Sequence, residues 1–260
     1  MLHFGLIGEH LGHSMSVPIH QALYRLLGIE ADYQLYELPR DTFKQDAEKL
    51  LHTLDGFNIT IPYKQDIMPL LKSIDPFAQA IGAVNTVRCK DASGYNTDAP
   101  GFAAMLRRHG IDPAGKPAFV LGTGGAAKAI VAALQNMGAI SVTCVSRHPK
   151  GGDITYEQLA DDFSGVLVNC TPVGMWPNVD GCPIPGHQLK DILRRAAGVA
   201  DVIYNPAETV LTKAAAAAGV PACTGLYMLV DQAVEAERRW LDCPIPADMT
   251  ATIMKEMTTR

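Results

Sequence analysis

The sequence lacks the cysteine patterns by which metal sites and disulfide frameworks are recognised. Its six cysteines stand at positions 89, 144, 170, 182, 223 and 243. They form no C-x-x-C pair, and none has a neighbouring histidine at the spacing typical of zinc ligands. We therefore expect no bound metal, and free thiols in a reducing cytoplasm.

Long apolar runs and an excess of basic residues are also missing. No stretch approaches the roughly 18 apolar residues that a membrane span needs, and the N-terminus carries no basic leader. Lys and Arg number 22 against 27 Asp and Glu, a net charge of -5, which gives no general attraction for nucleic acid or anionic membranes. We expect a cytoplasmic protein whose partner is a small molecule, with no nucleic acid and no membrane; the oligomeric state, a homodimer included, stays open.

The chain does contain regular alternation between strand and helix patterns. In the first part, strands are predicted at 2–8, 31–38 and 56–60, with helices at 18–27 and 41–52. A second series follows, with strands predicted at 118–121, 141–145, 166–169 and 199–203, and helices at 101–109, 126–137, 226–240 and 246–257. Strands that alternate with helices imply parallel sheets with right-handed crossovers, so the sequence predicts two successive α/β sheets.

A glycine-rich segment opens the second series. Residues 120–127 read V-L-G-T-G-G-A-A and match G-x-G-x-x-A between a predicted strand and a predicted helix. Glycines let the backbone approach a pyrophosphate, and the start of a helix attracts its charge. A turn needed only for packing is the alternative. We predict dinucleotide contacts from Gly122, Thr123, Gly124, Gly125 and Ala126.

The next strand of this unit ends without the acid that would bind the ribose hydroxyls of NAD. Ser146, Arg147 and Lys150 stand there instead, and a guanidinium suits the 2'-phosphate of NADP. Solvated surface charges are the alternative. The position favours NADP over NAD.

Four polar segments of the first series stand at the predicted ends of strands. They read H-S-M-S at 13–16, N-I-T-I-P-Y-K at 58–64, G-A-V-N-T at 82–86 and G-Y-N-T-D at 94–98. Because ligands bind beyond the carboxyl ends of strands in open α/β sheets, we expect these segments to converge. Taken singly, each is more typical of helix caps and turns than of a binding site.

Together these segments, with three more, resemble the shikimate dehydrogenase family along the whole chain. The further motifs are N-C-T-P-V-G-M at 169–175, D-V-I-Y-N-P at 201–206 and G-L-Y-M-L-V-D-Q at 225–232. The resemblance implies an α/β protein with an N-terminal substrate-binding domain, a C-terminal Rossmann-like dinucleotide-binding domain and a cleft between them. We expect the first domain at 1–101, joined by a C-terminal helix at 240–260, and the second at 102–239.

The resemblance also implies the roles of individual residues. Lys64 and Asp98 would be the catalytic pair, because a Lys ammonium can stabilise and protonate the oxygen of a ketone that is being reduced. The residues expected to bind substrate are Ser14, Ser16, Asn58, Thr60, Asn85, Tyr204 and Gln232. Those expected along the nicotinamide half of the cofactor are Thr171, Pro172, Val173, Met175, Gly225 and Met228. For Met228, a place in the helix core is the competing interpretation.

Some positions depart from the family pattern. Val17 intervenes before Pro18, Gln21 stands where Asn is common, and S-R-H at 146–148 replaces the N-R-T of many NADP-dependent members. The predicted catalytic pair is intact.

The function predicted is reversible, NADP-dependent reduction of 3-dehydroshikimate to shikimate in aromatic amino-acid biosynthesis, by the chorismate pathway. One alternative is a quinate or dual quinate/shikimate dehydrogenase that uses NAD or NADP; the presence of both Ser14 and Ser16 favours shikimate, since quinate needs room for an extra hydroxyl. The other is a non-catalytic, dinucleotide-binding regulatory protein. The pair Lys64 and Asp98 favours an enzyme over that alternative.

Overall fold

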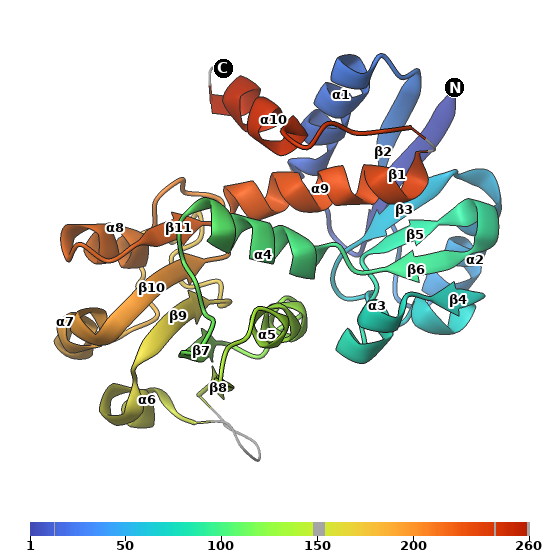
Figure 1. Ribbon diagram of the computed structural model, residues 1–260. Coiled ribbons are helices and arrows are strands. Elements are labelled where there is room, and N and C mark those ends of the chain that lie inside the picture. Colours follow the sequence, from blue (N-terminus) through green and yellow to red (C-terminus); the bar gives the residue numbers. More distant parts are fainter. Residues whose placement is uncertain (13, 148–153, 242, 259–260) are drawn as a thin grey trace. The chain divides into compact units, whose positions relative to one another are not determined.

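The chain forms two compact units. The computed structural model describes residues 1–12, 14–147, 154–241 and 243–258. Unit 1 comprises Met1–Asp98 and Val230–Arg260, and unit 2 comprises Ala99–Leu229 (Figure 1). The dividing points fall inside two helices, α4 (Asp98–Arg108) and α9 (Leu226–Trp240). The functional limits of the domains, at 1–101 and 102–239, stay a prediction.

Unit 1 is built on a six-stranded mixed sheet. Its strands lie in the order β2 (Ala31–Glu37), β1 (Leu2–Gly8), β3 (Gly56–Ile59), β5 (Thr86–Arg88), β6 (Ser93–Tyr95) and β4 (Ser73–Ile74). β1 pairs in parallel with β2 and β3, whereas β5 is antiparallel to both β3 and β6. The expectation of a parallel arrangement is therefore wrong for β5.

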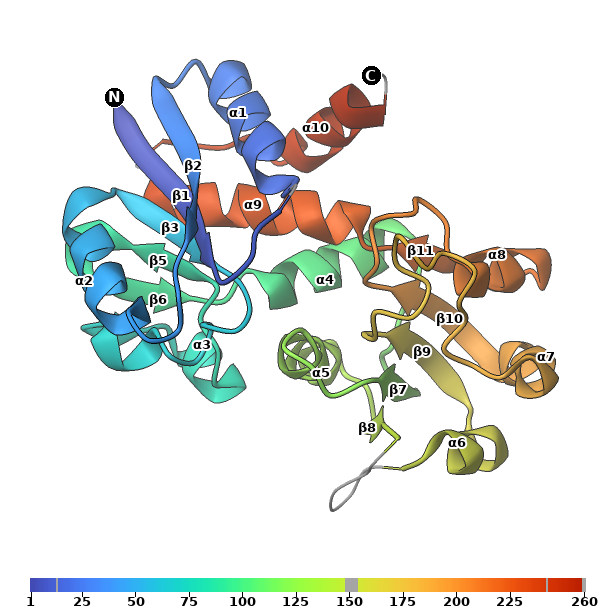
Figure 2. The same cartoon turned by 180° about the vertical axis from the view of Figure 1, so that it is seen from behind.

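Helices cover both faces of this sheet (Figures 1 and 2). They are α1 (Ser16–Leu27), α2 (Phe43–Thr53), α3 (Pro76–Ile81), α10 (Met249–Thr258) and the later part of α9, with short 3-10 helices η1 (Met68–Leu70) and η2 (Cys89–Asp91). Side chains alternate along β1, so that Phe4 packs in the core shared with Tyr24 of α1, and Ile7 in the opposite core shared with Phe43 of α2. Each such buried side chain contributes about 1.5–3 kcal/mol of transfer free energy.

Helix α9 returns the chain to unit 1 and closes this core. The Trp240 ring stacks on Phe4 at a centroid distance of 4.8 Å, and its Nε1 donates a hydrogen bond of 2.8 Å to the carbonyl oxygen of Val87. A Cβ at Gly56 would lie 2.5 Å from the indole, so the small residue makes room for it. The last part of the chain is thus an integral part of unit 1.

Unit 2 contains a five-stranded parallel sheet. Its strands lie in the order β11 (Ala222–Thr224), β10 (Ala196–Asp201), β9 (Gly165–Asn169), β7 (Pro117–Leu121) and β8 (Ser141–Val145). Helices α6 (Tyr156–Asp162), α7 (Gly186–Arg195) and α8 (Val210–Ala217) pack on one face, and α5 (Ala127–Asn136) lies on the other (Figures 1 and 2).

The strand order of unit 2 locates a place for a ligand. The chain runs from β7 outward to β8, then crosses back to β9 on the other side of β7. The loops after β7 and β9 therefore leave the sheet in opposite directions and open a crevice at its carboxyl edge, where α/β proteins bind ligands. The alternation of strands and helices in both units confirms the α/β class.

Across the described residues, no helix combines the length and apolar character needed to cross a membrane.

Candidate functional site

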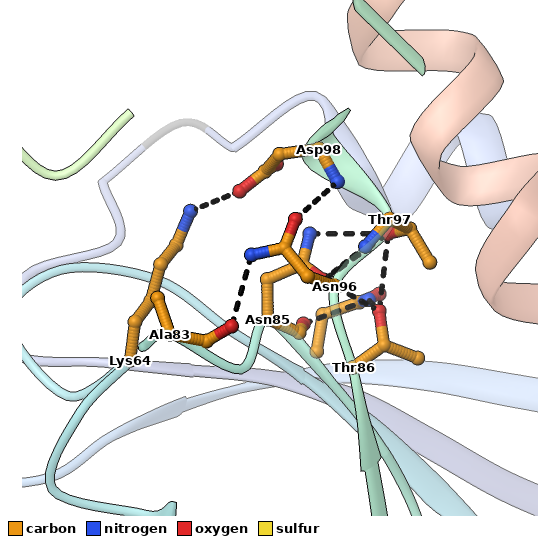
Figure 3. A network of polar contacts seen from close by, with 8 residues as sticks. Lys64, Ala83, Asn85, Thr86, Asn96, Thr97 and Asp98 are labelled. Atoms are coloured by element: carbon orange, nitrogen blue, oxygen red, sulfur yellow. Dashed lines mark hydrogen bonds and ion pairs between the residues drawn. The ribbon is translucent and has the colours of Figure 1, made fainter. Parts of the chain in front are cut away.

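Lys64 and Asp98 form an ion pair in unit 1. Lys64 follows β3, and Asp98 is the first residue of α4. The Lys64 Nζ donates to Asp98 Oδ2 at 2.6 Å, and the two side chains are 15% and 12% exposed (Figure 3). Screening by water is weak at this degree of burial, so the two opposite charges attract each other strongly, while both side chains retain some access to solvent.

A ladder of hydrogen bonds holds Asp98 in place. The Asn96 Nδ2 donates to the carbonyl oxygen of Ala83 at 3.0 Å, and the Asn96 Oδ1 accepts from the backbone N–H of Asp98 at 3.1 Å (Figure 3). On the other side, the backbone N–H of Val84 donates to the carbonyl oxygen of Lys64 at 2.8 Å. The segment at 82–86 therefore fixes both members of the pair.

Asn85 and Asn58 extend the same network into the sheet. The backbone N–H of Thr97 donates to Asn85 Oδ1 at 2.7 Å, and Asn85 Nδ2 donates to Thr97 Oγ1 at 3.0 Å. The Asn58 Nδ2 donates to Thr86 Oγ1 at 3.0 Å. These side chains are between 0% and 4% exposed. The structure thus joins four of the predicted site residues, Lys64, Asp98, Asn58 and Asn85, by short hydrogen-bonded paths.

The prediction that each polar segment follows a strand is wrong for residues 82–86. This segment precedes β5, which begins at Thr86. Because β5 is antiparallel to β3 and β6, its start lies beside the ends of both: Thr86 pairs with Asn58 and with Tyr95. The segments meet at one edge, as expected, but the reversed strand direction brings the third one there.

The remaining predicted substrate residues lie on several elements. The Ser14 Oγ accepts from the backbone N–H of Ser16 at 3.2 Å where α1 begins. Thr60 follows β3, and its backbone N–H donates to the carbonyl oxygen of Ile7 at 2.9 Å. Gln232 lies on α9 within unit 1, whereas Tyr204 belongs to unit 2. Their contacts with substrate stay a prediction.

The glycine-rich turn lies between β7 and α5, as the sequence predicted. Gly122 has φ +94°, a conformation that favours glycine, and Gly124 and Gly125 are exposed. The first N–H groups of a helix lack partners within the helix and attract anions. The turn thus offers the chemistry that a pyrophosphate needs.

A cavity of about 620 Å³ adjoins this turn. It is lined by residues from the carboxyl ends of three strands and from two other segments: Gly122, Thr123, Gly124, Ser146, Arg147, Tyr156, Cys170, Thr171, Pro172, Val173, Cys182 and Pro183. The buried Ser146 Oγ has no hydrogen-bond partner within the described residues. A second cavity of about 520 Å³ is lined by residues 172–178, 180 and 181, which include Met175.

A buried carboxylate fixes the loop after β9. Asp201 is fully buried and accepts hydrogen bonds from Asn169 Nδ2 at 3.0 Å and Thr209 Oγ1 at 2.8 Å. Burial raises the pKa of Asp201, and hydrogen bonds from the Ile203 N–H, Asn169 and Thr209 oppose the shift. Asn169 Oδ1 in turn accepts from the Thr171 hydroxyl at 2.7 Å. The N-C-T-P and D-V-I-Y-N-P motifs are thus parts of one hydrogen-bonded support for the cavity wall.

Lys150, Met228 and Gly225 were also predicted to contact the cofactor. Lys150 lies outside the described residues. Met228 is 8% exposed on α9, a degree of burial that fits the competing interpretation as core. Gly225 approaches the backbone closely: a Cβ there would lie 2.1 Å from the carbonyl oxygen of Val202.

Tyr156, Cys170, Cys182 and Pro183 line the cavity but were not predicted as site residues. Tyr156 is the first residue of α6, whose start is marked by the capping box of Thr155 and Gln158. The T-x-x-Q spacing could have predicted the helix, but no local pattern indicates that its first residue faces a cavity built from other strands. Burial raises the pKa of Tyr156, and the nearby Arg147 charge opposes this.

The described residues contain no cluster of three or more His, Cys, Asp or Glu suited to a metal ion. The six cysteines are free.

Comparison with known proteins gives one consistent family. The family model for the shikimate dehydrogenase substrate binding domain matches residues 6–87. A shikimate dehydrogenase (NADP(+)) of Clostridium beijerinckii is 39% identical over 259 residues, covering 95% of this chain and 94% of the relative.

Solved structures give the same result. A chorismate mutase/shikimate 5-dehydrogenase fusion protein from Clostridium acetobutylicum aligns with a TM-score of 0.93 at 36% identity, over 100% of this chain and 98% of that one. A shikimate 5-dehydrogenase from Thermus thermophilus, solved in complex with NADP(H) and shikimate, aligns with a TM-score of 0.85 at 31% identity, over 98% of this chain and 99% of that one.

Proposed function

The chain belongs to the shikimate dehydrogenase family, and on that basis we propose that Lys64 and Asp98 are the groups that carry out its reaction. The enzyme is an NADP-dependent oxidoreductase that interconverts shikimate and 3-dehydroshikimate, a step of aromatic amino-acid biosynthesis. The observation that carries the assignment of the pair is the 2.6 Å contact between Lys64 Nζ and Asp98 Oδ2 at a largely buried position.

The reaction needs a group that donates a proton to the substrate oxygen in one direction and removes it in the other. NADPH supplies a hydride to the ring ketone, and NADP⁺ accepts it back in the reverse direction. Negative charge then develops on the ketone oxygen, and the Lys64 ammonium stabilises that charge and donates the proton that completes the hydroxyl. An ammonium has three N–H donors, so Lys64 can contact the substrate while it remains bonded to Asp98.

Asp98 has two roles in this proposal. Its carboxylate orients the Lys64 ammonium through the 2.6 Å hydrogen bond between them. Its second oxygen can accept a hydrogen bond from a substrate hydroxyl. The Asn96 and Asn85 network, which is buried and hydrogen-bonded around Asp98, supports this geometry before the substrate arrives.

Hydroxyl and amide groups are proposed to bind the rest of the substrate. Ser14, Ser16 and Tyr204 would donate to its carboxylate, while Thr60, Asn85 and Gln232 would contact ring hydroxyls or the carboxylate, with Asn58 close by. Hydroxyl donors can bind a carboxylate without an Arg. We also place the enzyme in the cytoplasm, where its free thiols would stay reduced.

The cavity of unit 2 suits a dinucleotide phosphate. Its glycine turn can hold the pyrophosphate, and the unpartnered Ser146 Oγ together with the Arg147 guanidinium can hold a 2'-phosphate. The residues proposed for the nicotinamide half are Thr171, Pro172, Val173, Met175, Gly225 and Met228.

The test is the initial rate of cofactor reduction with shikimate or quinate, each paired with NADP or NAD. Fast turnover with shikimate and NADP, and slow turnover in the other three combinations, is the expected result. Equal or faster turnover with quinate or NAD would reassign the protein to the quinate or dual-specificity branch. Tight NADP binding without turnover of either acid would indicate a regulatory protein.

Arg147→Ala should weaken the binding of NADP but not the binding of NAD. Loss of a charge-assisted contact to the 2'-phosphate is expected to raise the KM for NADP by about 10- to 100-fold. The KM for NAD, which lacks that phosphate, should stay unchanged. Steady-state kinetics with both cofactors measure the difference.

Arg194→Ala is the matched control, because Arg194 is an exposed arginine on α7 that pairs with Asp191 at 3.1 Å. It removes the same charge and should alter neither KM. An equal rise in both KM values for Arg147→Ala would contradict a contact with the 2'-phosphate.

A further inference from the structure

Tyr33 connects two segments that are proposed to bind the substrate. Its side chain projects from β2 and is 4% exposed. The phenol O–H donates to Asn58 Oδ1 at 2.8 Å. Burial and the charge of Glu237 raise the pKa of Tyr33, and a hydrogen bond from the Ser16 side chain opposes the shift. The phenol oxygen therefore donates to Asn58 on β3 and faces the Ser16 hydroxyl on α1.

Two buried groups fix the Tyr33 ring. The imidazole of His20 stacks on it at a centroid distance of 3.9 Å and an interplanar angle of 7°. The His20 Nδ1 lies 2.6 Å from Glu237 Oε1, and both side chains are 0% exposed. His20 stands one helical turn after Ser16 on α1, so the same helix face holds the ring and the hydroxyl. The phenol has little freedom to move.

Asn58 connects Tyr33 by hydrogen bonds to the network around the catalytic pair. Its Nδ2 donates to Thr86 Oγ1 and to the carbonyl oxygen of Asn85, so all of its polar atoms are engaged. The Asn58 carbonyl oxygen can only accept hydrogen bonds, and the Tyr33 hydroxyl supplies the donor. Removal of the phenol hydroxyl would leave a buried acceptor without its donor, a state that favours rearrangement of the amide.

We propose that Tyr33 is a positioning residue for the substrate, which it serves by holding in place the Ser16 hydroxyl oxygen and the Asn58 amide that supports Asn85. A hydroxyl hydrogen rotates about its C–O bond, so Ser16 can turn its hydrogen to an arriving carboxylate while Tyr33 keeps its oxygen in place. Tyr33 does not touch the reacting atoms. Tyr33 therefore contributes to substrate binding and not to the chemical step.

Tyr33→Phe tests this role, because it removes only the hydroxyl. The KM for shikimate should rise about tenfold, the loss expected for one fixed hydrogen bond. The kcat and the KM for NADP should stay within about twofold of the wild-type values. Calorimetric titration with shikimate should show the same tenfold loss of affinity.

Tyr24→Phe is the matched control. Tyr24 belongs to the same buried cluster, with 3% exposure and its ring 5.9 Å from that of Phe4, but within the described residues its hydroxyl has no hydrogen-bond partner and so bonds to no proposed substrate residue. This variant loses a buried phenol hydroxyl from the same core, and its KM for shikimate should not change. Equal increases in KM for both variants would overturn the proposal, because they would indicate a general loosening of the core.

A double variant separates action through Ser16 from an independent effect. If Tyr33 acts by positioning Ser16, then Tyr33→Phe in a Ser16→Ala background should raise KM by clearly less than it does alone. Full multiplication of the two effects, an unchanged KM in Tyr33→Phe, or a fall in kcat with constant KM would each overturn the proposal. The inference rests on the proposed function, and the wild-type assay with shikimate and NADP tests that function separately.

Discussion

Replacement of Lys64 by alanine is expected to lower kcat for shikimate oxidation by about 1,000-fold, the effect of losing one donor aimed at a developing oxyanion, or about 4 kcal/mol of barrier. The KM for shikimate should change by less than about tenfold, because the proposed hydroxyl and amide contacts remain. Steady-state kinetics in both directions measure the two parameters. The loss should appear in both directions, since the same group transfers the proton to and from the substrate oxygen.

Lys49→Ala provides the control for the loss of an ion pair as such. Lys49 Nζ contacts Asp46 Oδ1 at 2.8 Å on α2, but its side chain is 63% exposed. Exposed pairs of this kind contribute about 0.2–1 kcal/mol, and neither residue of this pair belongs to the proposed site. Its removal should leave kcat and KM unchanged. A Lys64→Ala enzyme with near-normal turnover would rule out the role assigned to Lys64.

The Gly225→Ala variant should be strongly destabilised. A Cβ at this position would lie 2.1 Å from the Val202 carbonyl oxygen and 2.5 Å from its carbon, and the Gly225 N–H donates to the carbonyl oxygen of Ile203 at 2.8 Å. The backbone must shift, at a cost of about 3 kcal/mol. For a chain of this size, such a loss lowers the midpoint of thermal unfolding by about 6–12 °C.

Gly186→Ala is the matched substitution, because a Cβ at this first residue of α7 meets no atom within 4 Å. It should leave the midpoint unchanged or slightly raise it, since alanine restricts the unfolded chain. If Gly225→Ala unfolds at the wild-type temperature but binds NADP poorly, then Gly225 serves the cofactor and not the packing. The close approach to Val202 favours the packing explanation.

Long periodic elements of this fold were predictable from the sequence, and short ones were not. The strand expected at 141–145 is observed as β8, and the helix expected at 226–240 is α9. Between residues 73 and 95, however, the strands span only two or three residues, too few for a period of two to be detected. No sequence pattern therefore indicated that β5 runs antiparallel to its neighbours.

Helix α1 shows how one residue can displace a predicted boundary. The prediction started the helix at Pro18, but α1 begins at Ser16. Proline is tolerated in the first turn because the N–H that it lacks has no partner there. A proline near the start of a helical pattern is therefore compatible with a helix that begins slightly earlier.

The parts of the site that depend on local chemistry were predictable, and those that depend on distant contacts were not. The glycine turn and the absence of an acid after β8 are local signals. Lys64 and Asp98 were paired through the family resemblance, and the structure adds the distance between them. The contact of His20 with Glu237 joins positions 217 residues apart, and neither residue stands in a motif.

The discontinuous composition of unit 1 has a consequence for biosynthesis. Glu237 and Trp240, which pack against His20 and Phe4, leave the ribosome only after all of unit 2 has been translated. Until then, the first 98 residues expose a buried histidine, the Phe4 ring and the Val87 carbonyl that the last helices cover. An N-terminal fragment is therefore expected to lack part of its own core, and the nascent chain is expected to leave this half incomplete, and open to chaperones, until helix α9 has been synthesised.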